Sequence, residues 1–506
     1  MNSKTNNIQL LMISIIILLS FVIRIKGIWF GYPLATHPDE PRIVNTALQM
    51  LQTGDLNPHF FNYPTLIIYV QALLSAVTIF VLKIFAGISA QEIPVVWFHI
   101  VGRAYNVLLA SASVFLVWDI GRKLLSDTAG LAAAAFLAVA YLHVSNSYLI
   151  TVDVSVALWT LLAVSMAAHI YTRGPALRYY LWGGVFVGLA IGSKYTAFVA
   201  MAPLLLAHFL SGGPARDQRL WLCLSIAPLV FLLTTPFALL DMQNFIVALQ
   251  YESNHYRTGH PGFEAQGQTS FELYLRYLLS PGFGILPTLM SMLGLLWMMV
   301  RKRREALLLL SAPLLLFLFV GQYKVFFPRN IVAVIPFLSI FSGVVFHIVY
   351  QQIRAYSGTD IASVITGFVL VGCVWSPTID AFQHTQTVSL PDTRVISQNW
   401  AIKNLPPGST VGREHYTPPL EDHSDAFQVF PLGSFAVVRV PERVLEQDYM
   451  IVSEADYGRY VDEPERYPDE ARRYEDFFDS HVLIHETIAS LETNGPTIRI
   501  YKLNGD

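Results

Sequence analysis

Charged residues are scarce in this chain. Only 14% of its 506 residues are Asp, Glu, Lys or Arg, whereas 54% are hydrophobic, and the mean hydropathy is +0.47. This composition excludes an ordinary soluble globule and is typical of a polytopic membrane protein. The net charge of −3 and the lack of a lysine-rich arm argue against nucleic acid as a partner. The only two cysteines, Cys223 and Cys373, lie in apolar runs, which excludes a disulfide framework and zinc-ligand spacing.

Long apolar stretches recur along the first three quarters of the chain, and about twelve of them are candidate membrane spans. The basic residues gather in short loops between them, such as residues 301–304, which should face the cytoplasm. All of these loops can face the cytoplasm only if one early candidate does not cross the membrane. The best choice is residues 63–87, which carry Gln71 and Lys83 and would form a helix lying in the membrane interface. An ordinary span is the alternative. We therefore predict about eleven transmembrane helices with a cytoplasmic N-terminus.

The region after the first span predicts an outer loop, residues 31–97, that contains two surface helices. Residues 41–53 have the spacing of an amphipathic helix, with apolar side chains on one face and polar side chains on the other. Gly54-Asp55 follows as a helix stop signal. The C-terminal part, residues 377–506, is polar and has strand-like runs at 435–440, 449–452 and 497–503 and a helical pattern at 394–404. The predicted fold is thus an all-α polytopic membrane domain, residues 1–376, followed by an extracytoplasmic α/β domain.

Two adjacent carboxylates, Asp39 and Glu40, stand just beyond the first apolar run. An isolated charge near the hydrocarbon costs roughly 2.5 to 3.5 kcal/mol on insertion scales, so charges persist there mainly where they pair or act in function. A structural interpretation is that Asp39 only caps the next helix, with Pro41 in its first turn. Catalysis and capping therefore remain open at this point.

Several motifs, taken in order, resemble those of GT-C glycosyltransferases, in particular protein O-mannosyltransferases and lipid A aminoarabinose transferases. The resemblance covers roughly the first 350 residues, and the motifs together are more specific than any one alone. They are His37-Pro38-Asp39-Glu40-Pro41-Arg42, Leu51 to Pro58, Tyr63-Pro64-Thr65-Leu66, Gly102-Arg103, Ala129-Gly130-Leu131, Thr151-Val152-Asp153, Gly188 to Tyr195 and Phe327-Pro328-Arg329-Asn330.

The resemblance implies a glycosyltransferase that moves a hexosyl or pentosyl group from a polyprenyl-phosphate carrier to an acceptor outside the membrane. The acceptor could be protein, lipid or polysaccharide. An outer-loop aspartate would be the general base, a role for which Asp39 is our candidate and which is worth about 10² to 10⁴ in rate. Glu40 would orient Asp39, raise its pKa by like-charge proximity, or hold the acceptor.

A departing lipid phosphate needs positive charge in a water-poor site. Four basic residues map to the outer ends of spans, although Lys and Arg usually gather on the cytoplasmic side. They are the predicted phosphate ligands: Arg103, Lys194, Lys324 and Arg329. Snorkelling to lipid headgroups is the alternative for each. Arg24 and Lys26, near the outer end of the first span, are weaker candidates because an interfacial anchor also fits there.

Asp153 has two interpretations of similar weight, a second acidic group for a divalent ion or acceptor, or a helix cap. Because the chain has no dense Asp-x-Asp cluster, the sequence favours an enzyme without a metal cofactor, with a divalent ion as the alternative. A polytopic transporter or flippase of a lipid-linked or anionic substrate is the competing function. It predicts charges near the membrane midplane and an inverted repeat, and neither is evident in the sequence.

Overall fold

A computed structural model describes residues 3–264, 268–438 and 446–503 of the chain. The chain divides into two compact units, Met1–Ile28 with Asp39–Thr385, and Trp29–Pro38 with Gln386–Asp506. The change between the units therefore falls later than the predicted boundary after residue 376. The reason is that the last membrane-unit helix continues through polar residues as far as Thr387.

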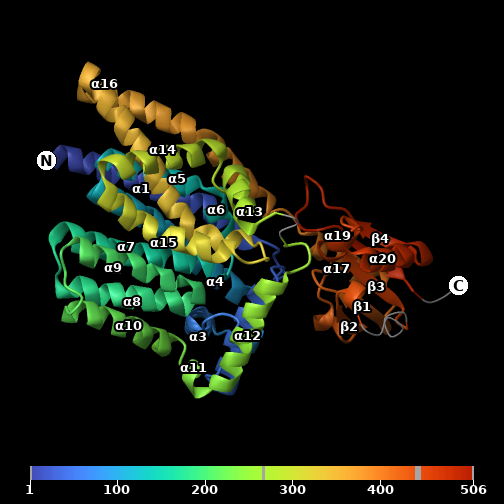
Figure 1. Cartoon of the computed structure of the whole chain (residues 1–506). Helices are drawn as coiled ribbons and strands as arrows, with labels where there is room; N and C mark the ends of the chain where they lie inside the picture. Colours follow the sequence, from blue (N-terminus) through green and yellow to red (C-terminus); the bar gives the residue numbers. More distant parts are fainter. Residues whose placement is uncertain (1–2, 265–267, 439–445, 504–506) are drawn as a thin grey trace. The chain divides into compact units, whose positions relative to one another are not determined.

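The first unit is built from α-helices joined by short 3₁₀ and irregular segments. Its long helices run roughly alongside one another, and α12 crosses them at a steep angle (Figure 1). The helices are α1 (Ser3–Ile25), α2 (Glu40–Thr53), α3 (Leu66–Ala86), α4 (Val95–Leu124), α5 (Asp127–Val139), α6 (Tyr141–Ser147), α7 (Asp153–Arg173), α8 (Leu177–Ser193), α9 (Ala202–Leu210), α10 (Gln218–Thr234), α11 (Phe237–Leu240), α12 (Met242–Thr258), α13 (Ser270–Tyr277), α14 (Ile285–Arg301), α15 (Arg303–Gly321) and α16 (Ile335–Thr387).

Within the described residues, six helices are long and apolar enough to cross a membrane, or up to eight if each bent pair of helices counts as one span. Shorter apolar helices, among them α10, add to these. Helix α16 is broken at Gly358, whose φ of 80° is not helical, and its two halves form a hairpin (Figure 1). The count of eleven stays a prediction.

Helix α2 occupies the predicted amphipathic segment. It buries Ile43, Val44, Ala47 and Met50, and it ends at Gly54, whose left-handed φ of 74° favours glycine. Helix α3 follows where the second surface helix was expected. With 21 mostly apolar residues, α3 also satisfies the length and hydropathy criteria for a span, so its non-crossing placement stays a prediction.

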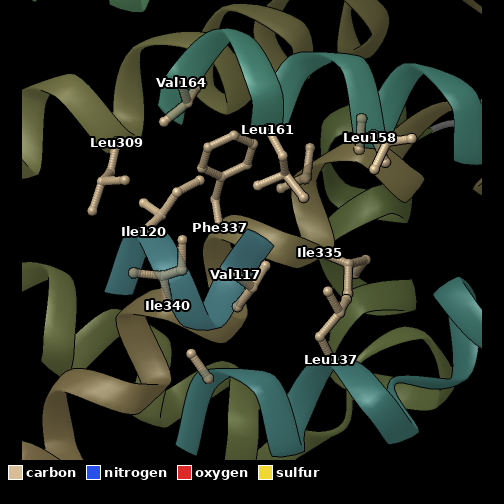
Figure 2. Packing of buried hydrophobic residues seen from close by; sticks show 14 of the residues in the cluster. Val117, Ile120, Leu137, Leu158, Leu161, Val164, Leu309, Ile335, Phe337 and Ile340 are labelled. Carbon is tan, nitrogen blue, oxygen red and sulfur yellow. The ribbon is translucent and has the colours of Figure 1, made fainter. Parts of the chain in front are cut away.

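The core of the first unit joins helices that are far apart in the sequence. Figure 2 shows the Phe337 ring of α16 between Leu161 and Val164 of α7 on one side and Ile120 of α4 on the other. All four side chains are at most 1% exposed. Burying such side chains stabilises the fold by about 1.5–3 kcal/mol each, and their packing fixes the helix ends that carry the site.

A buried arginine stabilises the 57° bend between α5 and α6. The Arg24 guanidinium donates to the carbonyl oxygens of Leu137 (3.1 Å) and Ala138 (2.7 Å), in the last turn of α5, and contacts His143 Nδ1 at 3.1 Å. The bend would otherwise leave those carbonyls without partners in an apolar interior. Arg24 is fully buried, so it is neither an interfacial anchor nor placed to meet a phosphate.

The second unit is α/β, as predicted. Its mixed five-stranded sheet has the order β2-β1-β3-β5-β4, with β1 parallel to β2 and β3, and β5 antiparallel to β3 and β4. The elements are α17 (Thr393–Asn404), β1 (Ser409–Glu414), β2 (Phe427–Gly433), β3 (Tyr449–Ser453), α19 (Glu454–Val461), α20 (Pro468–Ser480), β4 (Val482–Thr487) and β5 (Ile498–Lys502).

The sequence predicted two of the three interior strands of this sheet and neither edge strand. The runs at 449–452 and 497–503 form β3 and β5, and 394–404 forms most of α17. The strand predicted at 435–440 is wrong where it can be tested, since Phe435–Val437 is a 3₁₀ turn, and residues 439–440 lie outside the described residues. Strands β1, β2 and β4 were not predicted because their Gly, Pro and charged residues weaken the strand pattern.

The ten-residue segment Trp29–Pro38 belongs to this second unit, although it immediately precedes Asp39 in the chain. The Arg394 guanidinium holds it by donating to the Thr36 carbonyl oxygen at 2.8 Å. Arg394 is itself fixed by Asp392, to which it donates twice, at 2.8 and 2.7 Å. The second unit is thus assembled from two stretches of sequence.

Candidate active site

Asp39 stands at the N-terminal end of α2, as the capping hypothesis required, but its carboxylate does not cap the helix. Instead, Asp39 Oδ2 accepts a hydrogen bond from Arg329 Nη1 at 2.5 Å. Both side chains are partly exposed, at 23% for Asp39 and 29% for Arg329. This pair brings the first outer loop together with the segment that precedes α16.

Asp153 and Lys194 form a second ion pair. Lys194 Nζ donates to Asp153 Oδ1 at 2.7 Å and to Asn330 Oδ1 at 2.8 Å. Asp153 is only 4% exposed and lies in the first turn of α7, whereas Lys194 follows the last residue of α8. Asn330 is the residue after Arg329, so the two ion pairs are tied to the same short segment.

The two ion pairs face one small cavity, which we call the central cavity. Both acids and both bases line it, together with side chains of the α2 start, the α6–α7 loop and α12. Its lining is Asp39, Ile43, Tyr63, Thr151, Val152, Asp153, Lys194, Tyr256 and Arg329. Two carboxylates and two cations at one cavity can serve both proton transfer and anion binding.

The motif around Gly188 explains how Lys194 reaches this cavity. A Cβ atom on Gly188 would lie 2.6 Å from the Ala227 carbonyl oxygen of α10, and one on Gly192 would collide with Thr234. Only glycine lets α8 approach α10 this closely. The close approach sets the end of α8, and with it Lys194, at the cavity.

Glu40 and Arg103 pair with each other in the interior. Arg103 Nε and Nη2 donate to the two Glu40 carboxylate oxygens at 2.9 and 2.6 Å, and both side chains are 0% exposed. Glu40 Oε1 also accepts from the Ile150 amide at 2.9 Å, and Arg103 Nη1 donates to the Ile28 carbonyl at 2.8 Å. The pair therefore fastens the start of α2 to α4, to the 3₁₀ turn after α1 and to the α6–α7 loop. Neither residue lines the central cavity.

Lys324, the remaining predicted phosphate ligand, has an exposed side chain. Its backbone amide donates to the Tyr256 carbonyl at 3.2 Å, which ties its segment to the end of α12. The structure thus gathers Asp39, Asp153, Lys194 and Arg329 around one cavity. Glu40 and Arg103 are buried in the interior and Lys324 is exposed, and none of the three lines that cavity.

A larger cavity of about 290 Å³, the side cavity, adjoins the central one and shares Tyr63, Lys194 and Tyr256 with it. Its lining is Asn62, Tyr63, Pro64, Lys194, Tyr195, Thr196, Leu249, Glu252, Ser253, Tyr256, Phe319, Val320, Tyr323 and Asn330. Sequence reasoning missed Glu252 and Asn62. Asn62 directly precedes the Tyr63-Pro64 motif but is not part of it. Glu252 lies in a polar helix whose composition is that of an ordinary solvated segment.

The environment of Glu252 is unusual for a carboxylate. Asn62 Nδ2 donates to Glu252 Oε1 at 2.5 Å. Burial raises the pKa of the Glu252 carboxyl above its ordinary value, although the Asn62 hydrogen bond and the charges of His255, Lys194 and Arg329 oppose that shift. A carboxyl group in a cavity with a perturbed pKa is a candidate functional group.

The structure provides one observation on metals. Among the described residues, no group of three or more His, Cys, Asp or Glu side chains is arranged to hold a metal ion. The Asp153 carboxylate is engaged by Lys194. Metal independence stays a prediction, since a substrate could complete a site that the protein alone does not form.

Comparison with known proteins agrees with the architecture. Residues 75–239 match a family model described as dolichyl-phosphate-mannose-protein mannosyltransferase. No match is found among curated proteins. One similar solved structure is the oligosaccharyltransferase AglB from Archaeoglobus fulgidus with an inhibitory peptide and dolichol-phosphate (14% identity, 98% of this chain and 74% of that one, TM-score 0.63).

A second similar structure is ArnT from Cupriavidus metallidurans, with 15% identity, 98% of each chain covered and a TM-score of 0.58. The same protein bound to undecaprenyl phosphate matches at 15% identity, with 97% of each chain covered and a TM-score of 0.58. These matches span both units of the chain and agree with its apolar helices. The chain is therefore a multi-pass membrane protein with the GT-C glycosyltransferase fold, as its ordered motifs indicated.

Proposed function

We propose that this protein transfers a sugar from a polyprenyl-phosphate carrier to an acceptor on the outer face of the membrane. The observation that carries the proposal is the central cavity, where Asp39 and Asp153 meet Arg329 and Lys194. Similar folds solved with dolichol-phosphate and undecaprenyl phosphate support this class of donor. The sugar, hexose or pentose, and the acceptor, whether protein, lipid or polysaccharide, are left open by the proposal.

In the proposed reaction, Lys194 and Arg329 hold the phosphate of the carrier. Each keeps N–H donors beyond those bound to its acidic partner, because an ammonium has three and a guanidinium five. Bond cleavage between the sugar C1 and the phosphate oxygen leaves negative charge on the phosphate. Fixed cations in a site with little water stabilise that charge as it develops.

Asp39 is the proposed general base. As the acceptor oxygen bonds to C1, its proton passes to the Asp39 carboxylate, and the C1–phosphate bond breaks with its electron pair on the phosphate. Asp153 would position Lys194 through their 2.7 Å contact. Glu40 and Arg103 would hold the start of α2, and thus Asp39, in place, which makes them positioning residues.

The orientation in the membrane follows from the basic loops and is testable. We expect reporters fused at Asp55, Gly259 and the C-terminus to be outside, and one fused after Gly358 to be cytoplasmic, because Arg and Lys favour the inner side. Paired phosphatase and fluorescent reporters measure this. A reporter between Ile88 and Pro94 tests α3 directly, and a cytoplasmic signal there would make α3 a crossing helix.

The phosphate site predicts a lipid-dependent gain in stability. Undecaprenyl phosphate at a hundredfold excess over its Kd should stabilise the folded protein by about 2.7 kcal/mol. Replacing Lys194 or Arg329 with Ala should weaken binding about 10- to 100-fold, since each removes a charged hydrogen-bond donor. Thermal unfolding in detergent, with neutral undecaprenol for comparison, measures the shift.

Lys324→Ala is the matched control for these variants, because it removes the same charge from an exposed side chain and should leave lipid binding unchanged. Equal stabilisation by phosphate and neutral lipid in all four proteins would reduce Lys194 and Arg329 to headgroup anchors. That outcome would remove the main physical support for a phosphate-linked sugar donor.

A further inference from the structure

The side cavity contains a carboxylate that the proposed reaction does not use. Glu252 Oε1 accepts from Asn62, while Oε2 has no hydrogen-bond partner that the described residues provide. The two residues come from different segments, the loop after α2 and the middle of α12. They meet at the wall of a cavity that shares three residues with the central cavity.

The lining of the side cavity is mostly apolar and carries a few hydrogen-bonding groups, a combination that can bind a sugar ring by its face and its hydroxyl groups. Its volume of about 290 Å³ is near the lower end of the roughly 300–1,000 Å³ typical of small-molecule sites. Four tyrosines offer flat apolar faces, and Glu252, Asn62 and Asn330 offer hydrogen-bonding groups. A carboxylate oxygen left facing hydrocarbon would be costly, so the position of Glu252 disfavours a lipid tail as the occupant.

We propose that the side cavity receives the sugar ring of the lipid-linked donor and that Glu252, held by Asn62, accepts hydrogen bonds from its hydroxyl groups. This inference rests on the proposed function. Lys194 lines both cavities, so a phosphate bound there would place the attached sugar at the boundary between them. Glu252 is then a determinant of which sugar is accepted, and it takes no part in bond cleavage.

The test compares binding of sugar-free and sugar-bearing carriers. Undecaprenyl phosphate is used alone and carrying mannose, glucose, N-acetylglucosamine or arabinose. Wild-type protein should bind at least one sugar-bearing carrier more tightly than the sugar-free one. Glu252→Gln should lose about tenfold of that preference, because a charged acceptor is removed, and should bind the sugar-free carrier as wild type does.

A matched control separates sugar contact from a structural role. Asn57 Nδ2 donates to Asp241 Oδ2 at 2.8 Å, an amide–carboxylate hydrogen bond between the same loop and the residue just before α12. Asp241 also accepts from Asn244, and it lies outside the lining of both cavities. Asp241→Asn removes the corresponding charge there. If Glu252 only ties the segments together, both variants should lower the melting temperature alike and leave the sugar preference intact.

Three outcomes decide the matter. Loss of the sugar preference in Glu252→Gln, with Asp241→Asn unchanged, supports the inference. An unchanged preference in Glu252→Gln overturns it, as does a wild-type protein that binds no sugar-bearing carrier more tightly than undecaprenyl phosphate. Failure of the proposed function would look different, because the sugar-free carrier itself would then not bind and no sugar would be transferred.

Discussion

Asp39→Asn should lower sugar transfer about 10²- to 10⁴-fold, the usual contribution of a general base. The substitution keeps the shape of the side chain and removes its capacity to take up a proton. Arg329 and Lys194 remain, so binding of undecaprenyl phosphate should persist. A fall in turnover with little change in carrier binding identifies an interaction that acts in the transition state.

Turnover is measured with purified protein and a labelled donor, with and without a metal chelator, which also tests metal independence. Asp55→Asn is the control, because Asp55 lies just beyond the other end of α2 with a side chain that is 53% exposed. It should retain wild-type transfer. Near-wild-type turnover by Asp39→Asn would remove Asp39 from the mechanism.

The second large effect concerns the buried pair. Glu40→Gln should lower the free energy of unfolding by about 3–5 kcal/mol, because it leaves the Arg103 charge uncompensated in the interior. Arg103→Ala should cost a similar amount. Replacing both with Met should be less harmful than either single change, since an apolar pair removes both charges together. Thermal and denaturant unfolding in detergent provide the measurement.

An exposed pair provides the comparison. Glu272 and Arg276 form an i,i+4 salt bridge with side chains 46% and 61% exposed, and Glu272→Gln should change stability by less than about 1 kcal/mol. The experiment also separates the roles of Glu40. If Glu40→Gln keeps wild-type stability yet loses turnover, Glu40 acts in the chemistry and its structural role is refuted.

The order of motifs in the sequence was enough to suggest that Asp39, Asp153, Lys194 and Arg329 belong to one site. Asp153 begins an apolar helix, Lys194 follows one and Arg329 shortly precedes one, and spans of similar length bring such ends to a common level. Asp39 begins the amphipathic α2, which follows the first apolar run. The same reasoning could not separate Arg103 from these residues. Arg103 was also predicted to lie at the end of a span, but it lies inside α4 and pairs with Glu40, a contact that sequence spacing does not reveal.

Other features depended on three-dimensional packing and could not be read from the sequence. Glu252 reaches the side cavity because α12 crosses the other helices, and nothing in its polar sequence fixes that crossing (Figure 1). The role of Arg24 depends on a bend in a different helix pair. Strands β1, β2 and β4 of the second unit contain Gly, Pro or charged residues, so their own sequences carry a weak strand signal.

The assignment of Trp29–Pro38 to the second unit has a practical consequence for chimeric proteins. Exchanging the C-terminal region with that of a relative at a single junction near Thr387 would leave this decapeptide facing a foreign partner in place of Arg394. The residue joined to its end is Asp39, so a mismatch there could be mistaken for altered acceptor selectivity. A fair exchange needs three junctions, before Trp29, after Pro38 and near Gln386, so that both stretches of the second unit are replaced together.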